Sequence, residues 1–362
     1  MKRVTYQLTT LAVSFVLLNC TPENDGGDSQ VLSELPLEQR KRLVSNYQKI
    51  KQLAISGNKD IIQSIIRTDF TTLDDLEKTY LIKYAIENGD CEDPNKEDEI
   101  GETPLLWAIS TQVTSVVEML VKQEGIDLNK KNKYGKTPLA YAKDRSAIDI
   151  VKLLIKNGAD VNEEYNDYEE TILSYAFSVD DTELIHLGIE KSHPDNLNKY
   201  NGKIGIRLFE ALALSSTDPS KQNRFIEIAK LFINKEGVNL NITNFYGSTP
   251  LHWIISCARN EKSPEIKKAF FEIAKLLIAK ENFDTNTQDN YGYTPLHSII
   301  LRVSDEKSPE IKKAFFEIAK LLIAKENFDA NTQDNYKCTP LDIAKTYSVS
   351  DIIELLEYKS CS

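Results

Sequence analysis

The sequence lacks the features that are typical of nucleic-acid-binding proteins, metal-binding proteins and enzymes. Basic residues are outnumbered, with 44 Lys and Arg against 55 Asp and Glu, and the formal net charge at pH 7 is −11. An acidic chain repels the phosphate backbone, which disfavours nucleic-acid binding. The five cysteines include no CxxC or Cys/His spacing of a metal site. No nucleophile–base pattern or glycine-rich phosphate loop occurs, so we expect no enzyme, no metal and no other cofactor.

Long hydrophobic runs are also missing, and the run near the N-terminus is short. Leu11–Leu18 follows the basic pair Lys2 and Arg3 and contains eight apolar or small residues. As a helix it would rise about 12 Å, against about 30 Å for a bilayer core. The run is too short to span a membrane, and it predicts a secretory signal peptide over residues 1–19.

The signal-like segment ends in Leu17-Leu18-Asn19-Cys20, which resembles the lipobox of bacterial lipoproteins. The resemblance implies cleavage before Cys20 and lipid attachment to that residue. Asn19 departs from the usual small residue, which leaves an uncleaved anchor, or a plain signal peptide with an unmodified Cys20, as alternatives. Residues 20–36 are polar and suit a flexible tether. We therefore expect the protein in the cell envelope, lipid-anchored to a membrane outside the cytoplasm, on a periplasmic or surface face.

The remainder of the chain repeats itself. Residues 261–291 recur as residues 306–336 with one change in 31 positions, where Thr285 is replaced by Ala330. The offset between the two copies is 45 residues. A repeating chain of this kind grows by stacking modules that cannot bury their apolar faces alone.

A Thr-Pro pair opens most of the repeats, where Thr is suited to cap a helix and Pro to occupy its first position. The pairs are Thr103-Pro104, Thr137-Pro138, Thr249-Pro250, Thr294-Pro295 and Thr339-Pro340. With Leu and His behind the pair, as at His252 and His297, the pattern G-x-T-P-L-H resembles the ankyrin repeat. The resemblance implies an all-α solenoid of helix-turn-helix modules with hairpin-like fingers. It also implies that the two histidines tie neighbouring turns by hydrogen bonds.

The repeats define an ankyrin-like domain over residues 37–362. We expect a helical cap at 37–67, about eight modules and a C-terminal cap at 339–362. The modules begin near Thr79, Thr103, Thr137, Thr171, Ile204, Thr249, Thr294 and Thr339.

The late modules contain a longer second helix, predicted from Pro264 to about Lys280. Phe225, Phe270 and Phe315 take equivalent positions in three of these helices. We interpret them as core, the alternative being an exposed hydrophobic ledge for a partner.

A tyrosine stands three residues before the opening Thr in five modules, and these positions fall on the fingers. Tyrosine is large, rigid and polar at its tip, which suits an interface. The alternative is that each ring packs on the neighbouring finger, and the sequence leaves both interpretations open. The residues are Tyr134, Tyr168, Tyr246, Tyr291 and Tyr336.

The cysteines allow one further hypothesis. Cys338 begins the first helix of the last module and Cys361 follows its second helix, so antiparallel packing would bring them together. A disulfide between them would stabilise the cap by up to about 3 kcal/mol. The alternative is that the two thiols are free or buried. The pattern assigns no role to Cys91 or Cys257.

These features predict a protein-interaction module, membrane-tethered and monomeric, that binds a protein partner of unknown identity on its fingers and inner helices. The alternatives are an accessory or inhibitory partner of an envelope enzyme, for example in oxidative-stress defence, and a secreted effector that binds host proteins. An ankyrin fold by itself implies only protein binding.

Overall fold

The computed structural model describes most of the chain beyond residue 92. The described residues are 45–46, 49–50, 52, 61, 64–65, 81–82, 93–98, 101–163, 171–198, 205, 207–209, 219–260 and 264–361. The predicted signal peptide, the lipid site Cys20, the tether, most of the N-terminal cap, Cys91 and Tyr168 lie outside them. Within the described part, no helix is long and apolar enough to cross a membrane.

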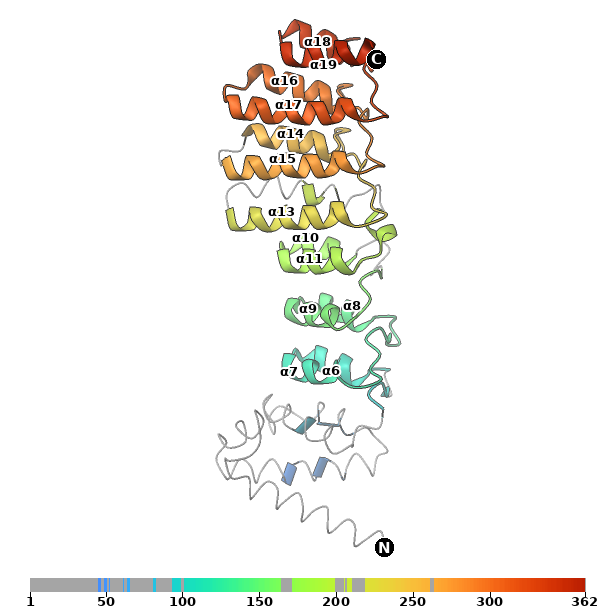
Figure 1. Cartoon of the computed structure of the whole chain (residues 1–362). Helices are drawn as coiled ribbons and strands as arrows, with labels where there is room; N and C mark the ends of the chain where they lie inside the picture. Colours follow the sequence, from blue (N-terminus) through green and yellow to red (C-terminus); the bar gives the residue numbers. More distant parts are fainter. Residues whose placement is uncertain are drawn as a thin grey trace. The chain divides into compact units, whose positions relative to one another are not determined.

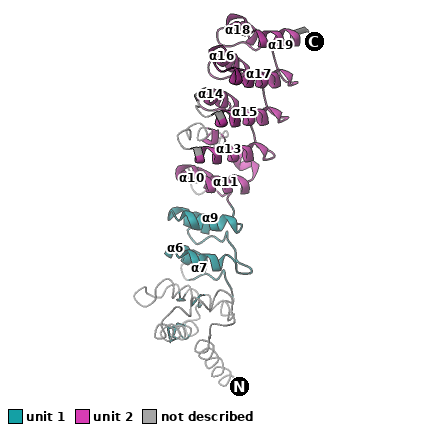
Figure 2. Ribbon diagram, turned by 60° about the vertical axis from the view of Figure 1, so that its left-hand side comes forward, with its two compact units in different colours: residues 1–160 teal, residues 161–362 magenta. Residues whose placement is uncertain are grey.

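The chain divides into two compact units, residues 1–160 and residues 161–362 (Figure 2). The described part of unit 1 contains two antiparallel helix pairs, in which α6 packs on α7 and α8 packs on α9. The pairs also stack, with α6 against α8 and α7 against α9. The helices are α6 (Pro104–Thr111), α7 (Thr114–Leu120), α8 (Pro138–Asp144) and α9 (Ile148–Lys156).

Unit 2 repeats the same arrangement over more modules (Figure 1). The inner helices α14, α16 and α18 pack in sequence, and the outer helices α11, α13, α15, α17 and α19 form a second row. The helices are α10 (Ile172–Ser178), α11 (Thr182–Lys191), α13 (Pro219–Asn234), α14 (Pro250–Asn260), α15 (Pro264–Ala279), α16 (Pro295–Asp305), α17 (Pro309–Ala324), α18 (Pro340–Thr346) and α19 (Ser350–Cys361). Every regular element among the described residues is a helix, so the all-α prediction is confirmed there.

The Thr-Pro pairs set where the inner helices begin. Thr294 is the N-cap of α16, and its hydroxyl accepts a hydrogen bond from the backbone N–H of His297. Pro295 follows at the first helical position, where a missing amide hydrogen is harmless. The same capping occurs at Thr103, Thr137, Thr171, Thr249 and Thr339.

Apolar side chains fill the space between successive modules. Phe225, Phe270 and Phe315 are each 1% exposed, which supports their interpretation as core rather than as a ledge. The helices that contain them are 16 residues long, compared with nine for α9. The longer helices bury more apolar surface against one another than the short ones can.

Lysines at the ends of the outer helices α13, α15 and α17 each link their module of unit 2 to the one before it. The Nζ of Lys325 donates to the carbonyl oxygen of Lys280 at 2.8 Å, and the Nζ of Lys280 donates to Asn234 Oδ1 at 3.0 Å. The Nζ of Lys235 donates to the carbonyl oxygen of Glu190 at 2.9 Å. A cation near the carbonyls that end a helix also interacts favourably with the helix dipole.

Candidate interaction surface

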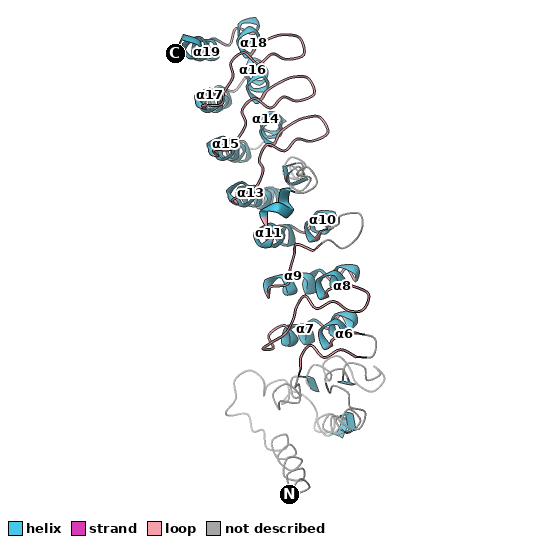
Figure 3. Cartoon of the chain, turned by 90° about the vertical axis from the view of Figure 1, so that its right-hand side faces the viewer, coloured by secondary structure: helices cyan, strands magenta, loops and turns pink. Residues whose placement is uncertain are grey.

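The fingers of unit 2 project side by side next to α14, α16 and α18 (Figure 3). Each finger tip is a turn organised by one carboxylate or amide. In the central finger, Asp289 Oδ1 accepts hydrogen bonds from the backbone N–H groups of Tyr291 and Tyr293, both at 2.9 Å. Gly292 follows with φ +80°, a conformation that favours glycine. The turn holds Tyr291 at the outer end of the finger.

The other described fingers contain the same turn. Asn244 Oδ1 accepts from the N–H of Tyr246, and Asp334 Oδ1 accepts from the N–H of Tyr336. In unit 1, Asn132 Oδ1 accepts from the N–H of Tyr134. The tyrosine position identified in the sequence is therefore a fixed position in a repeated turn.

Hydrogen bonds join neighbouring finger tips in unit 2. The backbone N–H of Asn290 donates to the carbonyl oxygen of Tyr246 at 2.9 Å, and that of Asn335 donates to the carbonyl of Tyr291 at 3.2 Å. The side-chain amides add to this, since Asn290 donates to the carbonyl of Phe245 and Asn335 to that of Asn290. The fingers are thereby held at the spacing of the modules beneath them.

The tyrosine rings are largely open to solvent. Tyr246 is 60% exposed, Tyr291 62% and Tyr336 74%, and Tyr134 in unit 1 is 71% exposed. Phe245, which sequence reasoning did not select, is 90% exposed. We call Tyr246, Tyr291 and Tyr336 of unit 2 the tyrosine row.

The ring contacts that the row makes are with residues of the same finger. Phe245 and Tyr246 lie edge to face with centroids 5.7 Å apart, and Tyr291 and Tyr293 are stacked at 6.2 Å. Rings buried against the adjacent finger would not retain such exposure. The geometry therefore favours the interpretation that these rings are available to bind a partner, and not that they pack on the neighbouring finger.

The two motif histidines are buried and link modules. His297 Nδ1 accepts from the backbone N–H of Thr294, and its Nε2 faces the carbonyl oxygen of Cys338 at 3.3 Å. Because a carbonyl only accepts, Nε2 must carry the proton and the ring is neutral. His252 has the same arrangement, with Nε2 2.9 Å from the carbonyl of Tyr293. Burial lowers the pKa of both imidazoles, in part offset by these carbonyls.

An asparagine at the base of each finger was not singled out in the sequence, although it recurs there. The Nδ2 of Asn241 donates to the carbonyl oxygen of Asn282 at 2.7 Å, and its Oδ1 accepts from the N–H of Asp284 at 2.8 Å. One side chain thus satisfies two backbone groups of the next module. Related bonds are made by Asn95, Asn129, Asn162, Asn198 and Asn286.

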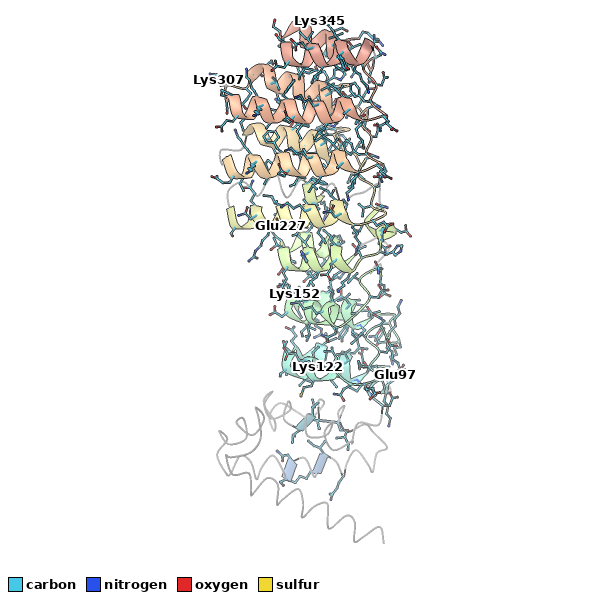
Figure 4. All side chains as sticks on the ribbon, viewed as in Figure 1. Glu97, Lys122, Lys152, Glu227, Lys307 and Lys345 are labelled. Carbon is cyan, nitrogen blue, oxygen red and sulfur yellow. The ribbon has the colours of Figure 1, made fainter. Side chains whose placement is uncertain are left out.

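Metal-binding groups and clefts are the features of the described residues that bear on a chemical function. They contain no group of three or more His, Cys, Asp and Glu that could hold a metal ion. An open cleft of about 480 Å³ lies between α11 and α13 and is lined in part by His186, Arg224 and Glu227. Glu227 points outward from α13, as do other charged side chains on the helices (Figure 4).

Cys338 is a free cysteine, which agrees with the free-thiol alternative and not with a bridge to Cys361. The finger determines its orientation, because its N–H donates to Asp334 Oδ1 at 2.9 Å and its Sγ lies 3.9 Å from the carbonyl oxygen of Tyr336. The side chain of Cys361 lies outside the described residues.

Antiparallel helix pairs joined by hairpin-like fingers define a helical repeat protein. The family model described as ankyrin repeats (three copies) matches residues 50–165 and 220–307, which together are more than half of the chain. The chain therefore belongs to the ankyrin repeat family. This family is an interaction scaffold, and membership indicates a protein–protein interaction module.

Solved structures with the same kind of repeat are similar to this chain only at low identity. An ankyrin repeat domain from Acinetobacter baumannii AYE is 19% identical, with a TM-score of 0.32, over 71% of this chain and 97% of that one. The ankyrin repeat protein EF0377 is 22% identical, with a TM-score of 0.28, over 72% of this chain and 98% of that one. A comparison with curated proteins found no significant match.

Proposed function

We propose that this protein is a membrane-tethered interaction module that binds a protein partner on the tyrosine row of unit 2. The observation that carries the proposal is the exposure of three tyrosines, 60–74%, in identical turns that are hydrogen-bonded to one another. Rigid aromatic side chains lose little conformational entropy when bound and are frequent binding hot spots. The fixed spacing of the fingers means that little ordering is needed on this side of the interface.

The membrane tether is the second part of the proposal and is supported by the sequence around Cys20. A lipid at Cys20 with a polar segment over residues 20–36 would leave the ankyrin units free to reach a partner near the membrane surface. The test is cell fractionation of the Cys20→Ser variant, with acylated-peptide analysis of the native protein. We expect the native protein in the membrane fraction, with acyl groups on Cys20, and the variant released from it.

Partner binding is tested by a photo-crosslinking amino acid placed at position 291 of the full chain. The matched control places the same group at position 358, because Tyr358 is 79% exposed but lies on α19, which the inner helix α18 separates from the fingers (Figure 3). We expect a protein captured from 291 and not from 358. Its affinity for the purified chain should fall at least tenfold on Tyr246→Ala with Tyr291→Ala, while Tyr358→Ala leaves it unchanged.

The identity of the captured protein also distinguishes a general interaction module from an accessory or inhibitory partner of an envelope enzyme. A captured envelope enzyme whose activity changes on binding would favour the accessory or inhibitory function. Unchanged affinity in the double variant, with helical circular dichroism intact, would show that the tyrosine row is not the binding surface.

A further inference from the structure

We infer that the segment recognised by the tyrosine row is a proline-rich peptide in the polyproline II conformation. The inference rests on the proposed function and specifies the chemistry of the partner. Three properties of the row support it, namely its lack of charge, its spacing and its unused hydroxyl groups.

The finger tips are nearly without charge. Among the nine tip residues 245–247, 290–292 and 335–337, Lys337 carries the one charge. The nearby acids are occupied by the turns, since Asp289 and Asp334 accept backbone hydrogen bonds and Asp334 is 4% exposed. Apart from Lys337, these tip residues offer no partner for an ion pair with a strongly acidic or basic peptide, so an uncharged segment suits the surface best.

The spacing of the row selects a conformation. Packed helices lie 8–10 Å apart, so equivalent tyrosines in adjoining modules repeat at about 8–10 Å. A polyproline II helix presents the same face every three residues, or about 9 Å at 3.1 Å per residue. A β-strand presents the same face every two residues, about 6.6 Å, and an α-helix every 5.4 Å turn. The polyproline period falls within the module spacing and so places one contact on each module in register, whereas two α-helical turns, about 10.8 Å, exceed it.

The rings supply the contacts that such a peptide needs. Polyproline II has no internal hydrogen bonds, so its carbonyl oxygens remain available as acceptors. The hydroxyl groups of exposed tyrosines donate to such carbonyls, while the ring faces pack on proline rings, as in other aromatic surfaces that bind proline-rich segments. Because the peptide is already extended when free, little entropy is lost on binding.

The test uses the full chain and fluorescently labelled decaproline, with binding followed by fluorescence anisotropy. Decaproline spans about 31 Å, enough for three modules, whereas tetraproline spans about 12 Å. We expect saturable binding of decaproline and at least tenfold weaker binding of tetraproline and of a ten-residue Gly-Ser peptide.

Variants of Tyr291 test what its ring and its hydroxyl group contribute to decaproline binding. Tyr291→Ala should weaken decaproline binding at least tenfold, because it removes the central ring. Tyr291→Phe keeps the ring and should weaken binding about threefold. Tyr358→Ala should change nothing. Because Tyr291 is 62% exposed, its removal should leave the fold intact, and an unchanged melting temperature of Tyr291→Ala verifies this.

The possible failures are distinguishable. If decaproline does not bind but the photo-captured partner still requires the row, the inference is wrong and the proposed function stands. If neither binds through the row, both are wrong. Equal binding of decaproline and the Gly-Ser peptide would overturn the inference. So would row-dependent binding of a β-1,4-linked N-acetylglucosamine hexamer in place of decaproline, since that result would indicate a glycan ligand.

Discussion

The Nε2 of His297 donates a hydrogen bond to the carbonyl oxygen of Cys338, 3.3 Å away and one module further along the chain. His252 makes the same bond to Tyr293 at 2.9 Å. In the last module the position is occupied by Asp342, which is exposed and whose carboxylate accepts from the N–H of Thr339, as the histidine Nδ1 atoms accept from Thr249 and Thr294. The histidine is therefore a link between modules at α14 and α16, whereas the equivalent positions of α6, α8 and α10 are Leu106, Ala140 and Ser174.

Lowering the pH should reduce the free energy of unfolding of unit 2, because His252 and His297 are buried in their neutral form. Burial lowers the pKa of both in the folded state, whereas the unfolded value is about 6.5. The unfolded chain therefore binds more protons as the pH falls. The stability that they contribute is complete above about pH 6.5 and is lost as the pH decreases through the folded pKa. Urea unfolding between pH 7.5 and pH 5 should show this loss.

A double variant isolates the histidine contribution from that of the carboxylates. His252→Gln with His297→Gln should be less stable at pH 7.5, by about 1 kcal/mol for each perturbed bond. It should then lose less stability than the native chain on acidification. The His186→Gln variant, at an exposed position on α11, should behave as the native chain does. Parallel pH profiles for native chain and double variant would contradict the assignment.

Two features of the structure require glycine at position 292: the left-handed conformation of its own turn and the close approach of the next finger. Its φ is +80°, and a Cβ atom there would lie 2.6 Å from the backbone nitrogen of Asn335. Gly292→Ala should therefore lower the free energy of unfolding by about 2 kcal/mol, since a strained left-handed residue and a backbone clash add together. Thermal and urea unfolding measure the change.

Lys337 provides the matched control, because it takes the same turn position with φ +68° in the last finger. No finger among the described residues packs over it. Lys337→Gly should change stability by less than about 0.5 kcal/mol, since relief of strain is offset by the added freedom of the unfolded chain. Equal effects of the two substitutions would show that the adjacent finger does not constrain position 292.

The sequence was sufficient to predict the helices and their starts, because these depend on local chemistry. Thr294 and Pro295 favour a helix start whatever surrounds them, and α15 was predicted from Pro264 to about Lys280 and found from Pro264 to Ala279. The direction of the Cys338 side chain depends on the Asp334 turn, a contact that the residue types alone do not specify. The exposure of Phe245 likewise depends on how far the finger extends beyond its neighbours.

The asparagine links between fingers should contribute measurably to stability. Asn241→Ala removes partners from the carbonyl of Asn282 and the N–H of Asp284, and should cost about 1 kcal/mol because both groups are partly solvated. Asn331 occupies the corresponding position in the last finger, and its side chain is exposed. Asn331→Ala should change stability by less than about 0.5 kcal/mol. A similar loss in both variants would argue against a role in joining modules.

Two helices of identical sequence allow the stack itself to be tested. α15 and α17 are both PEIKKAFFEIAKLLIA, yet Phe271 is 6% exposed and its counterpart Phe316 is partly exposed. Phe271 packs edge to face on Phe315 at 5.0 Å, whereas α17 is followed by the shorter α19, of 12 residues. The difference in burial therefore comes from the neighbouring module and not from the helix.

Alanine substitution at Phe271 and at Phe316 should lower the free energy of unfolding by different amounts, in keeping with their different burial. Phe271→Ala removes a buried ring and should destabilise the chain by about 3 kcal/mol. Phe316→Ala removes a ring that Lys320 covers at 4.6 Å and solvent partly reaches, so roughly 1 kcal/mol is expected. Both are measured by urea unfolding at pH 7.5, where His252 and His297 are neutral. Equal losses would mean that α17 does not cover α15 in solution, and the stacked arrangement that positions the fingers would be wrong.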